Sequence, residues 1–450
     1  MLMTHQQLLK GFSKFSPEEK LRFVSAHFDD SQQARKTFAS FIHPDPDIQQ
    51  RLSNFSENTI SNFPLPYGVA PNFMINGTLY LVPMVVEESS VVAAASAAAR
   101  FWAERGGFRA RVTDTSKNGQ LHFLYKGDPD QLKQAMPDII SHLRKHAAPV
   151  TANMEKRGGG VTKVSLKDQR HLIDQYFQLH VTFETGEAMG ANFINSCLED
   201  FSEGLQEFFS NTEGFEPRDF EPLMAILSNY NDECLVEVSA SCPVSELDHA
   251  SPGLTGKEFV RRFALASQIA EADVHRATTH NKGIMNGVDA VILATGNDFR
   301  AIEAGAHAFA ARSGTYRSLS RTQIKDGKFA FSLTMPMALG TIGGLTRLHP
   351  LAEKSMEMLG NPSARELMMI AAAAGLANNF AALRSLTTTG IQAGHMRLHM
   401  PNILTQLNAG EEESKQANRH FSNKKVSYQA VAAFLDQLRK PSPNAGKNHT

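Results

Sequence analysis

The chain has 450 residues, 42% hydrophobic and 20% charged, which indicates a globular protein with about two to four domains of ~100–200 residues each. Its 45 basic and 46 acidic residues give a formal net charge of −1, which argues against binding to nucleic acid or to an anionic membrane. No apolar run approaches the ~20 residues that span a bilayer, and the polar stretch Met1 to Lys20 lacks an apolar signal core.

The cysteines indicate the compartment. Cys197, Cys234 and Cys242 form neither a CxxC pair nor an even disulfide framework, a usage typical of a reducing environment. We therefore expect a cytoplasmic protein.

The N-terminal part is expected to be helical before the first strand. Polar helices extend to about residue 47, and Ser16-Pro17-Glu18-Glu19 is a typical helix start. Gly77 to Val86 is rich in β-formers and predicts a strand. The alanine-rich run Val91 to Ala103 predicts a helix with Ser89 or Ser90 as its N-cap.

The pattern changes between about residues 107 and 221. Two alternating runs, Arg109 to Thr115 and Gln120 to Tyr125, flank Asn118-Gly119, which predicts a hairpin turn. A helix, two strands and a second helix are expected next, over 130–146, 161–166, 176–185 and 191–209. This β-β-α-β-β-α order predicts a small antiparallel sheet with helices on one face, inserted into a larger fold.

The second half is denser in predicted elements. Asp326-Gly327 marks a further hairpin, and Pro362 precedes a long apolar helix over 364–386 that is expected to be buried. After Gly390 the chain becomes amphipathic and more charged. The other elements are strands over 234–240 and 290–294 and helices over 256–272 and 298–311.

Several common motifs are absent from the sequence. There is no GxGxxG after a strand, no Walker A motif, no HExxH and no GxSxG. His395 and His399 have the i, i+4 spacing of a zinc pair, but no third ligand motif stands near them. We therefore expect neither a Rossmann domain nor a metal.

Five segments in order resemble one family, the 3-hydroxy-3-methylglutaryl-CoA (HMG-CoA) reductases in their soluble bacterial class II form. One segment alone would be weak evidence for the family, but all five in this order are specific for it. They cover most of the chain from about residue 55 to 400: Glu57-Asn-Thr-Ile60 with Pro64-Leu-Pro-Tyr-Gly68; Val82-Pro-Met-Val-Val-Glu-Glu-Ser-Ser90 through Ser96; Glu187-Ala-Met-Gly-Ala-Asn192; Ala277-Thr-Thr-His-Asn-Lys-Gly-Ile-Met-Asn-Gly287 through Asp298; and Gly390-Ile-Gln-Ala-Gly-His-Met396.

The resemblance implies a multidomain fold, α/β in one part and α+β in another. A large domain around a long central helix would take 1–107 and 230–389. A small antiparallel α+β domain over 108–229 would bind the nicotinamide dinucleotide without a Rossmann fingerprint, in agreement with the missing GxGxxG. A C-terminal helical flap would take 390–450. Active sites in the family form at a dimer interface, so we expect a homodimer or a multiple of dimers.

The resemblance also implies roles for individual residues. The catalytic positions of the family match Glu88, Lys282, Asp298 and, on the flap, His395. Five residues fall where members hold the HMG carboxylate and nearby polar groups: Ser90, Asn229, Arg276, Thr279 and Asn286. Five belong to the expected cofactor site: Lys163, Glu187, Met189, Gly190 and Asn192.

These residue types suit the implied chemistry, in which two hydrides reduce a thioester to a primary alcohol. Lys282 would stabilise negative charge on the carbonyl oxygen, and Asp298 would hydrogen-bond that lysine. His395 would protonate the departing thiolate, and Glu88 would protonate the aldehyde oxygen. Taken singly, each residue more often has a structural role: Glu88 as a helix cap or ion-pair partner, Asp298 as a helix N-cap, and Lys282 as a solvated charge in a Gly/Asn-rich loop. Only their joint occurrence in the resemblance favours catalysis.

Three positions depart from the familiar pattern. Ser89 follows the acid pair where proline is common, Glu187 stands where Asp is commoner, and Lys163 stands where an acid often binds the ribose. A lysine there can attract the 2′-phosphate of NADPH. The expected cofactor is therefore NADPH or NADH, with the preference left open. The expected small molecules are HMG-CoA, mevalonate and CoA, with no nucleic acid, membrane or metal as partner. The alternatives are a catalytically silent CoA-ester-binding protein and a reductase of another acyl-CoA.

Overall fold

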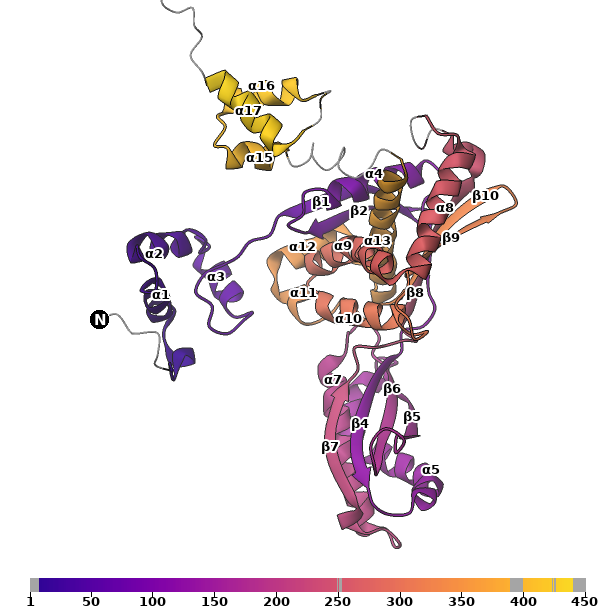
Figure 1. Cartoon of the computed structure of the whole chain (residues 1–450). Coiled ribbons are helices and arrows are strands. Elements are labelled where there is room, and N and C mark those ends of the chain that lie inside the picture. Colours follow the sequence, from indigo (N-terminus) through magenta and orange to yellow (C-terminus); the bar gives the residue numbers. More distant parts are fainter. Residues whose placement is uncertain are drawn as a thin grey trace, which may run out of the picture.

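The computed structural model describes residues 8–248, 250, 253–388, 400–422, 424 and 426–439. Buried apolar side chains in this part of the chain gather into three separate cores. In Figure 1 the elements that enclose the largest of them, the large core, stand in the middle. The sheet that covers the second core stands below them, and the C-terminal helices that enclose the third core stand above. The predicted mixed α/β fold with antiparallel sheets is confirmed.

The N-terminal helices begin where the sequence predicts. Ser16 Oγ accepts from the Glu19 amide at 3.2 Å, and Glu19 Oε2 accepts from the Ser16 amide at 2.8 Å, which makes a capping box. Figure 1 shows these helices standing apart from the large core. They are η1 Phe12–Lys14, α1 Pro17–Ser25, α2 Ser31–Ser40 and α3 Pro46–Ser53.

The large core contains two antiparallel sheets. The two-stranded sheet is a hairpin of β1 Tyr67–Ile75 and β2 Thr78–Val85, joined by Asn76 and Gly77 at positive φ. The sequence indicated β2 but not β1. The other sheet has the order β3-β8-β10-β9, with β3 Arg109–Val112, β8 Leu235–Pro243, β10 Lys328–Pro336 and β9 Ser320–Lys325.

Helices surround these sheets, and α13 Ala364–Thr387 lies at the centre. By length and composition α13 could cross a membrane, contrary to the sequence expectation, but 78% of its apolar window is buried inside the fold. It is therefore the core helix that the apolar run predicts. Its companions are α4 Val91–Ala103, η3 Val244–Leu247, α8 Gly256–Ala272, α9 Val274–Ala294, α10 Phe299–Ala310, α11 Leu345–Leu348 and α12 Pro350–Met358.

Helices α9 and α13 pack so closely that glycines stand where their backbones meet. A Cβ added to Gly287 of α9 would meet the carbonyl oxygen of Ala374, and one added to Gly375 of α13 would lie 2.7 Å from Val288 Cγ2. These glycines are required by the close approach and not by a turn, because neither has a positive φ. The contact fixes the height of α9 relative to the central helix.

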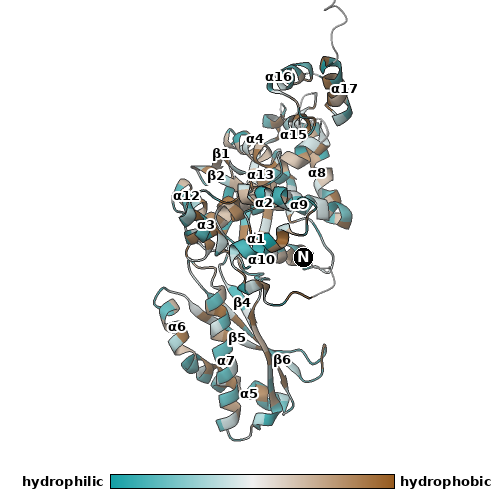
Figure 2. Ribbon diagram, turned by 90° about the vertical axis from the view of Figure 1, so that its left-hand side faces the viewer, coloured by the Kyte–Doolittle hydropathy of each residue, from teal (hydrophilic) through white to brown (hydrophobic). Residues whose placement is uncertain are grey.

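A separate four-stranded antiparallel sheet has the order β5-β6-β4-β7. Figure 2 shows its helices on one side of the strands, and the second core lies between them. The strands are β4 Lys117–Tyr125, β5 Gly160–Asp168, β6 Tyr176–Glu184 and β7 Phe220–Leu227. The helices are α5 Pro129–His146, α6 Ala148–Glu155, α7 Ala191–Asn211 and η2 Pro217–Asp219.

The predicted hairpin turn at Asn118-Gly119 is wrong, because both residues lie inside β4. Gly119 makes room for α7, since a Cβ there would lie 2.6 Å from Leu198 Cδ1. The strand at 109–112 pairs with β8 in the large sheet instead, and the fourth strand of the small sheet is β7. The predicted hairpin at Asp326-Gly327 is confirmed between β9 and β10. The three domain boundaries stay a prediction.

Two further expectations fail in α9. Residues 290–294, expected as a strand, form its last turn, and Lys282, expected in a loop, lies in its middle. Asp273 begins the helix by accepting from the Arg276 amide at 2.6 Å. A short buried apolar run does not distinguish strand from helix, and packing on α13 overrides the low helix propensity of glycine and asparagine.

The C-terminal helices form a small unit with their own core. Arg439 binds Glu413 through two nitrogens, at 2.7 and 2.9 Å, and so ties the last helix to its neighbour. The helices are α15 Met400–Gln406, α16 Glu411–His420 and α17 Tyr428–Arg439.

Candidate active site

Helix α9 presents one accessible polar stripe. Arg276, Thr279, Lys282 and Asn286 are spaced three, three and four residues apart, which places them on one face of the helix. Thr279 and Lys282 are exposed, and Arg276 and Asn286 are half-buried. The opposite faces are buried at Ala277, His280, Asn281, Ile284, Met285, Gly287 and Val288. The structure thus brings together four of the residues that the resemblance singled out.

Glu88 faces this stripe from the segment between β2 and α4. Its Oε2 accepts from Lys282 Nζ at 2.9 Å, and its Oε1 lies 3.4 Å from Ser90 Oγ. The side chain of Glu88 is 32% exposed and that of Lys282 is 64% exposed, so small molecules can reach the pair. Ser90 is the N-cap residue of α4, but its side chain makes no capping hydrogen bond. Its hydroxyl therefore serves the carboxylate and not the helix.

A buried polar network holds α9 behind the stripe. His280 Nε2 lies 2.6 Å from Ser320 Oγ, and that hydroxyl donates to Asn379 Oδ1 of α13 at 2.8 Å. Asn281 Nδ2 donates to the carbonyl of Arg317 at 2.9 Å. Burial, and secondarily the charge of Arg276, lowers the pKa of His280 to about 3, so this imidazole stays neutral at neutral pH. The network sets the rotation of α9 and the direction in which Lys282 points.

Asp298 is not part of the stripe on α9. It is the N-cap of α10, where its Oδ1 accepts from the amides of Arg300 and Ala301 at 3.0 and 3.2 Å. The Arg300 guanidinium pairs with it at 3.2 Å. Among the described residues it makes no hydrogen bond to Lys282, so that expected contact does not occur within one chain.

His395 lies outside the described residues, as does His399. Asn229, another expected site residue, is not on the stripe. Asn229 follows β7 and packs its backbone against α10, because a Cβ added to Gly305 would lie 2.8 Å from its carbonyl oxygen. Asn229 and Met189 line the same small cavity of about 10 Å³.

The expected cofactor loop docks onto the large core. Glu187 Oε2 accepts from Thr341 Oγ1 and from the amide of Ala364, the first residue of α13, both at 2.7 Å. Gly190, at φ +87°, is the N-cap of α7 and offers no side chain to its first amides. A Cβ at Gly190 would lie 2.5 Å from Thr185 Cγ2, so the loop turns tightly there. Asn192 is exposed in the first turn of α7.

Lys163 is exposed on β5, an edge strand of the small sheet. The register shifts between Val161 and Lys163, so the lysine sits next to a bulge.

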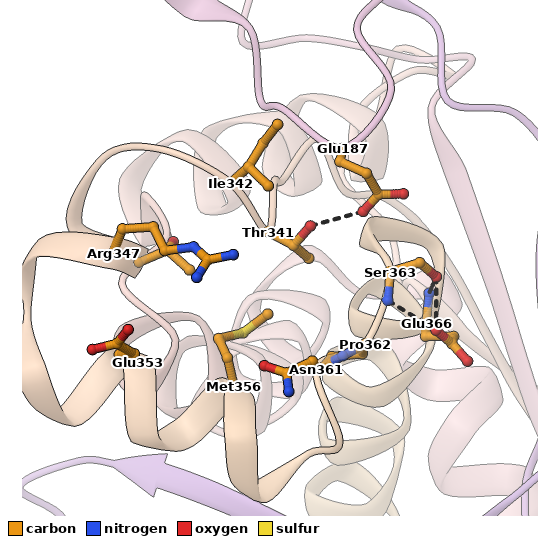
Figure 3. Close-up of a pocket in the computed structure, with 11 residues that line it drawn as sticks. Glu187, Thr341, Ile342, Arg347, Glu353, Met356, Asn361, Pro362, Ser363 and Glu366 are labelled. Carbon is orange, nitrogen blue, oxygen red and sulfur yellow. Dashed lines mark hydrogen bonds between the residues drawn. The ribbon is translucent and has the colours of Figure 1, made fainter. Parts of the chain in front are cut away.

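A cavity of about 400 Å³ lies beside Glu187 (Figure 3). Arg347 points into it from one side, and Thr341 hydrogen-bonds Glu187 on the other. Neither Glu88 nor Lys282 lines this cavity. No sequence motif marks Thr341 and Arg347. The run Gly340-Thr-Ile-Gly343-Gly344 fits no phosphate-loop motif, although Gly343 and Gly344 have positive φ.

Comparison with known proteins identifies the class. The family Hydroxymethylglutaryl-coenzyme A reductase matches residues 16–400. The 3-hydroxy-3-methylglutaryl-coenzyme A reductase of Archaeoglobus fulgidus is 37% identical over 436 residues, which cover 96% of this chain and 94% of the relative. A probable enzyme of the same name from Borreliella burgdorferi is 33% identical over 404 residues, covering 90% and 88%.

Solved structures agree with the sequence relatives. The 3-hydroxy-3-methylglutaryl-coenzyme A reductase from Streptococcus pneumoniae superimposes with a TM-score of 0.70 at 36% identity, covering 96% of this chain and 100% of that chain. A class II structure from the same organism, bound to NADPH in open conformations, gives 0.69 at 38% identity, with coverage of 85% and 100%.

The family match, the curated relatives and the NADPH-bound solved structure together show a NAD(P)H-dependent oxidoreductase. The chain belongs to the HMG-CoA reductase family, and the resemblance carried by the five sequence segments is confirmed. Within that family it is similar to the class II enzymes.

Proposed function

We propose that Glu88 and the α9 stripe form the site at which HMG-CoA is reduced to mevalonate and CoA by two successive hydride transfers. The observation that carries the proposal is the 2.9 Å contact between Lys282 Nζ and Glu88 Oε2 on an accessible surface. A lysine held in this way is a preorganised cation for the oxygen of the thioester, and the carboxyl beside it can exchange a proton with the same oxygen.

Each residue has a task in this scheme. Lys282 stabilises negative charge on the carbonyl oxygen in both steps. Glu88 supplies the proton to the aldehyde oxygen, and His395 protonates the CoA thiolate in the first step only. Arg276, nearly two turns before Lys282 on the stripe, and Asn286, one turn after it, bind the free carboxylate of the substrate. That carboxylate contact favours HMG over acyl-CoA substrates that lack a second acid.

The cofactor residues fit a nicotinamide dinucleotide, which supplies the hydride when bound. The uncapped N-terminus of the 21-residue helix α7 offers amide donors to an anion such as the pyrophosphate. Gly190, with no space for a Cβ beside Thr185, lets the backbone approach the ligand closely. Met189, Asn192 and the Glu187 loop would position the dinucleotide. We assign NADPH as the cofactor because Lys163 can meet a 2′-phosphate, and a class II relative is bound to NADPH.

The separation of Asp298 from Lys282 supports a site built by two chains. Asp298 caps α10 and does not reach the lysine of its own chain among the described residues. We therefore infer that a second copy supplies Asp298, within a homodimer or a multiple of dimers, and that Asn229 follows it. The enzyme is cytoplasmic in this proposal, with all three cysteines free and buried, and the proposed reaction uses no metal ion.

The same proposal covers the domain roles. The large core carries the catalytic pair, the small four-stranded sheet with α5 to α7 binds the dinucleotide, and the C-terminal helices act as the flap that brings His395 to the site. The separate cores of these three units support this division.

Steady-state kinetics with HMG-CoA and either NADPH or NADH tests the reaction. Two dinucleotides should be oxidised per mevalonate formed. Lys282→Ala should lower kcat by about 10²–10³-fold, the usual loss for one oxyanion stabiliser. Lys354→Ala is the matched control, because it removes an exposed lysine of α12 that pairs with Glu357 at 2.8 Å and is not part of the stripe. A stoichiometry of one, or equal loss in both variants, would refute the assignment.

Mixing inactive chains tests the shared site. In a dimer of one Lys282→Ala chain and one Asp298→Asn chain, a site built in trans is intact at one of its two copies. Random reassociation should then restore about a quarter of wild-type activity. Restoration at background level only would show that Asp298 acts within its own chain.

A further inference from the structure

Two histidines and one glutamate gather on the helical layer of the small sheet, remote from the stripe on α9. His142 and His146 are four residues apart on α5, and Glu207 faces them from α7. One ligand atom from each residue lies within 4.8 Å of the other two. The i, i+4 spacing places both imidazoles on one side of α5.

The two distances from the histidines to the carboxylate suit a small tetrahedral cation. Glu207 Oε2 lies 3.6 Å from His142 Nε2 and 3.2 Å from His146 Nδ1. Ligand atoms at about 2.0–2.1 Å from a tetrahedral zinc are about 3.3 Å apart, which falls between these two values. His142 Nε2 is buried and has no hydrogen-bond partner among the described residues, so a lone pair or proton there is unsatisfied.

The surrounding packing preorganises the three side chains. Gly204 of α7 lies under the imidazole of His146, because a Cβ there would lie 3.0 Å from the His146 Cγ atom. The absence of a side chain at 204 allows α5 to approach α7, one turn before Glu207. Phe208 packs edge-on against His142 with ring centroids 5.7 Å apart. The side chains remain accessible, at 33% for His142, 29% for His146 and 51% for Glu207.

We propose that His142, His146 and Glu207 bind one Zn²⁺ ion that links α5 to α7, with water as the fourth ligand. Two imidazoles and one carboxylate are donors that zinc accepts, and three protein ligands leave one position to solvent. The ion would stabilise the helical layer of the small sheet from outside, because it binds the folded arrangement and not the separated helices. It takes no part in hydride transfer.

Full-length protein stripped of metal is titrated with Zn²⁺ by calorimetry and with Co²⁺ by visible absorption. The wild type should bind one Zn²⁺ per chain with a Kd below about 10 µM and give the spectrum of a four-coordinate Co²⁺ site. His142→Asn, His146→Asn and Glu207→Gln should each raise the Kd at least about tenfold. The matched controls are His171→Asn, an exposed histidine in the same sheet unit, and Glu203→Gln, one turn earlier on α7.

A second measurement needs no substitution. Zn²⁺ should slow amide hydrogen exchange at the end of α5 and around Glu207 in α7, with no change in the stripe of α9. Loss of binding in the three variants but not in the controls, with this protection, supports the site. Unchanged binding in the three variants, equal loss in the controls, or no protection of α5 and α7 would overturn it.

Discussion

Lowering the pH should destabilise the large core through His280. Its pKa is about 3 in the native state because of burial, whereas an exposed histidine in the unfolded chain has its ordinary value of 6.5. Below pH 6.5 the unfolded chain therefore takes up a proton that the native state refuses, so the stabilisation is complete above that pH and is lost as the pH falls. Each pH unit removes up to about 1.4 kcal/mol, and the loss between pH 7.5 and 4.5 is about 2–3 kcal/mol.

The chain provides its own probe for this effect. Trp102 is the single tryptophan, it is fully buried in the large core, and its ring lies 5.0 Å from that of Phe380, the residue after Asn379. Urea unfolding followed by Trp102 fluorescence at several pH values therefore reports on the core that contains the His280 network. The reference is His280→Gln, which keeps a hydrogen-bonding group toward Ser320 but does not titrate.

The quantity to compare is the difference in unfolding free energy between wild type and His280→Gln. Every other titrating group is common to both proteins, so the difference isolates the histidine. It should move by about 2–3 kcal/mol in favour of the variant between pH 7.5 and 4.5. Parallel pH profiles for the two proteins would show that the buried imidazole does not resist protonation, and the reasoning would fail.

Gly287→Ala should destabilise the same core by about 1–3 kcal/mol in this assay, since its Cβ meets the Ala374 carbonyl, whereas a Cβ at Gly283 has 3.9 Å to its nearest neighbour and should cost nothing. Equal effects would contradict the packing argument. Lys282→Ala should slow reduction of HMG-CoA and of supplied mevaldehyde alike. His395→Gln should slow the first by about 10²–10⁴-fold and spare the second, and equal losses would leave His395 a structural role. Lys163→Asp should shift the ratio of kcat/KM values from NADPH toward NADH; an unchanged ratio would reject the 2′-phosphate contact.

Two similar dipeptides show what the sequence can and cannot predict. Asp326-Gly327 and Asn118-Gly119 carry the same hairpin signal, and only the first is a turn. Gly119 instead lies inside β4, where Leu198 of α7 packs against it and leaves no space for a side chain. No local sequence pattern indicates that contact. The helical state of Lys282 cannot be predicted from local sequence for the same reason, because the packing of α9 on α13 decides it.

The candidate site was predictable only through the family resemblance. Glu88 contacts Lys282, and the other residues of the α9 stripe share the face of the helix that carries this lysine. No spacing rule relates residue 88 to residue 282, because their meeting depends on how β2 packs against α9. The neutral state of His280 also depends on burial, and no sequence pattern carries that information.

The carboxylate of Glu187 acts as a mechanical tether. It joins the loop after β6 to two points of the large core, the Thr341 hydroxyl and the first amide of the central helix. Any swing of the small sheet relative to α13 must stretch both bonds together, at about 1 kcal/mol each. A movement of the loop before α7 would therefore strain or break the hydrogen bond to the first amide of α13. The position of the small sheet and that of the central helix are thus coupled through Glu187, whose backbone carbonyl also accepts from the Thr341 amide at 2.8 Å.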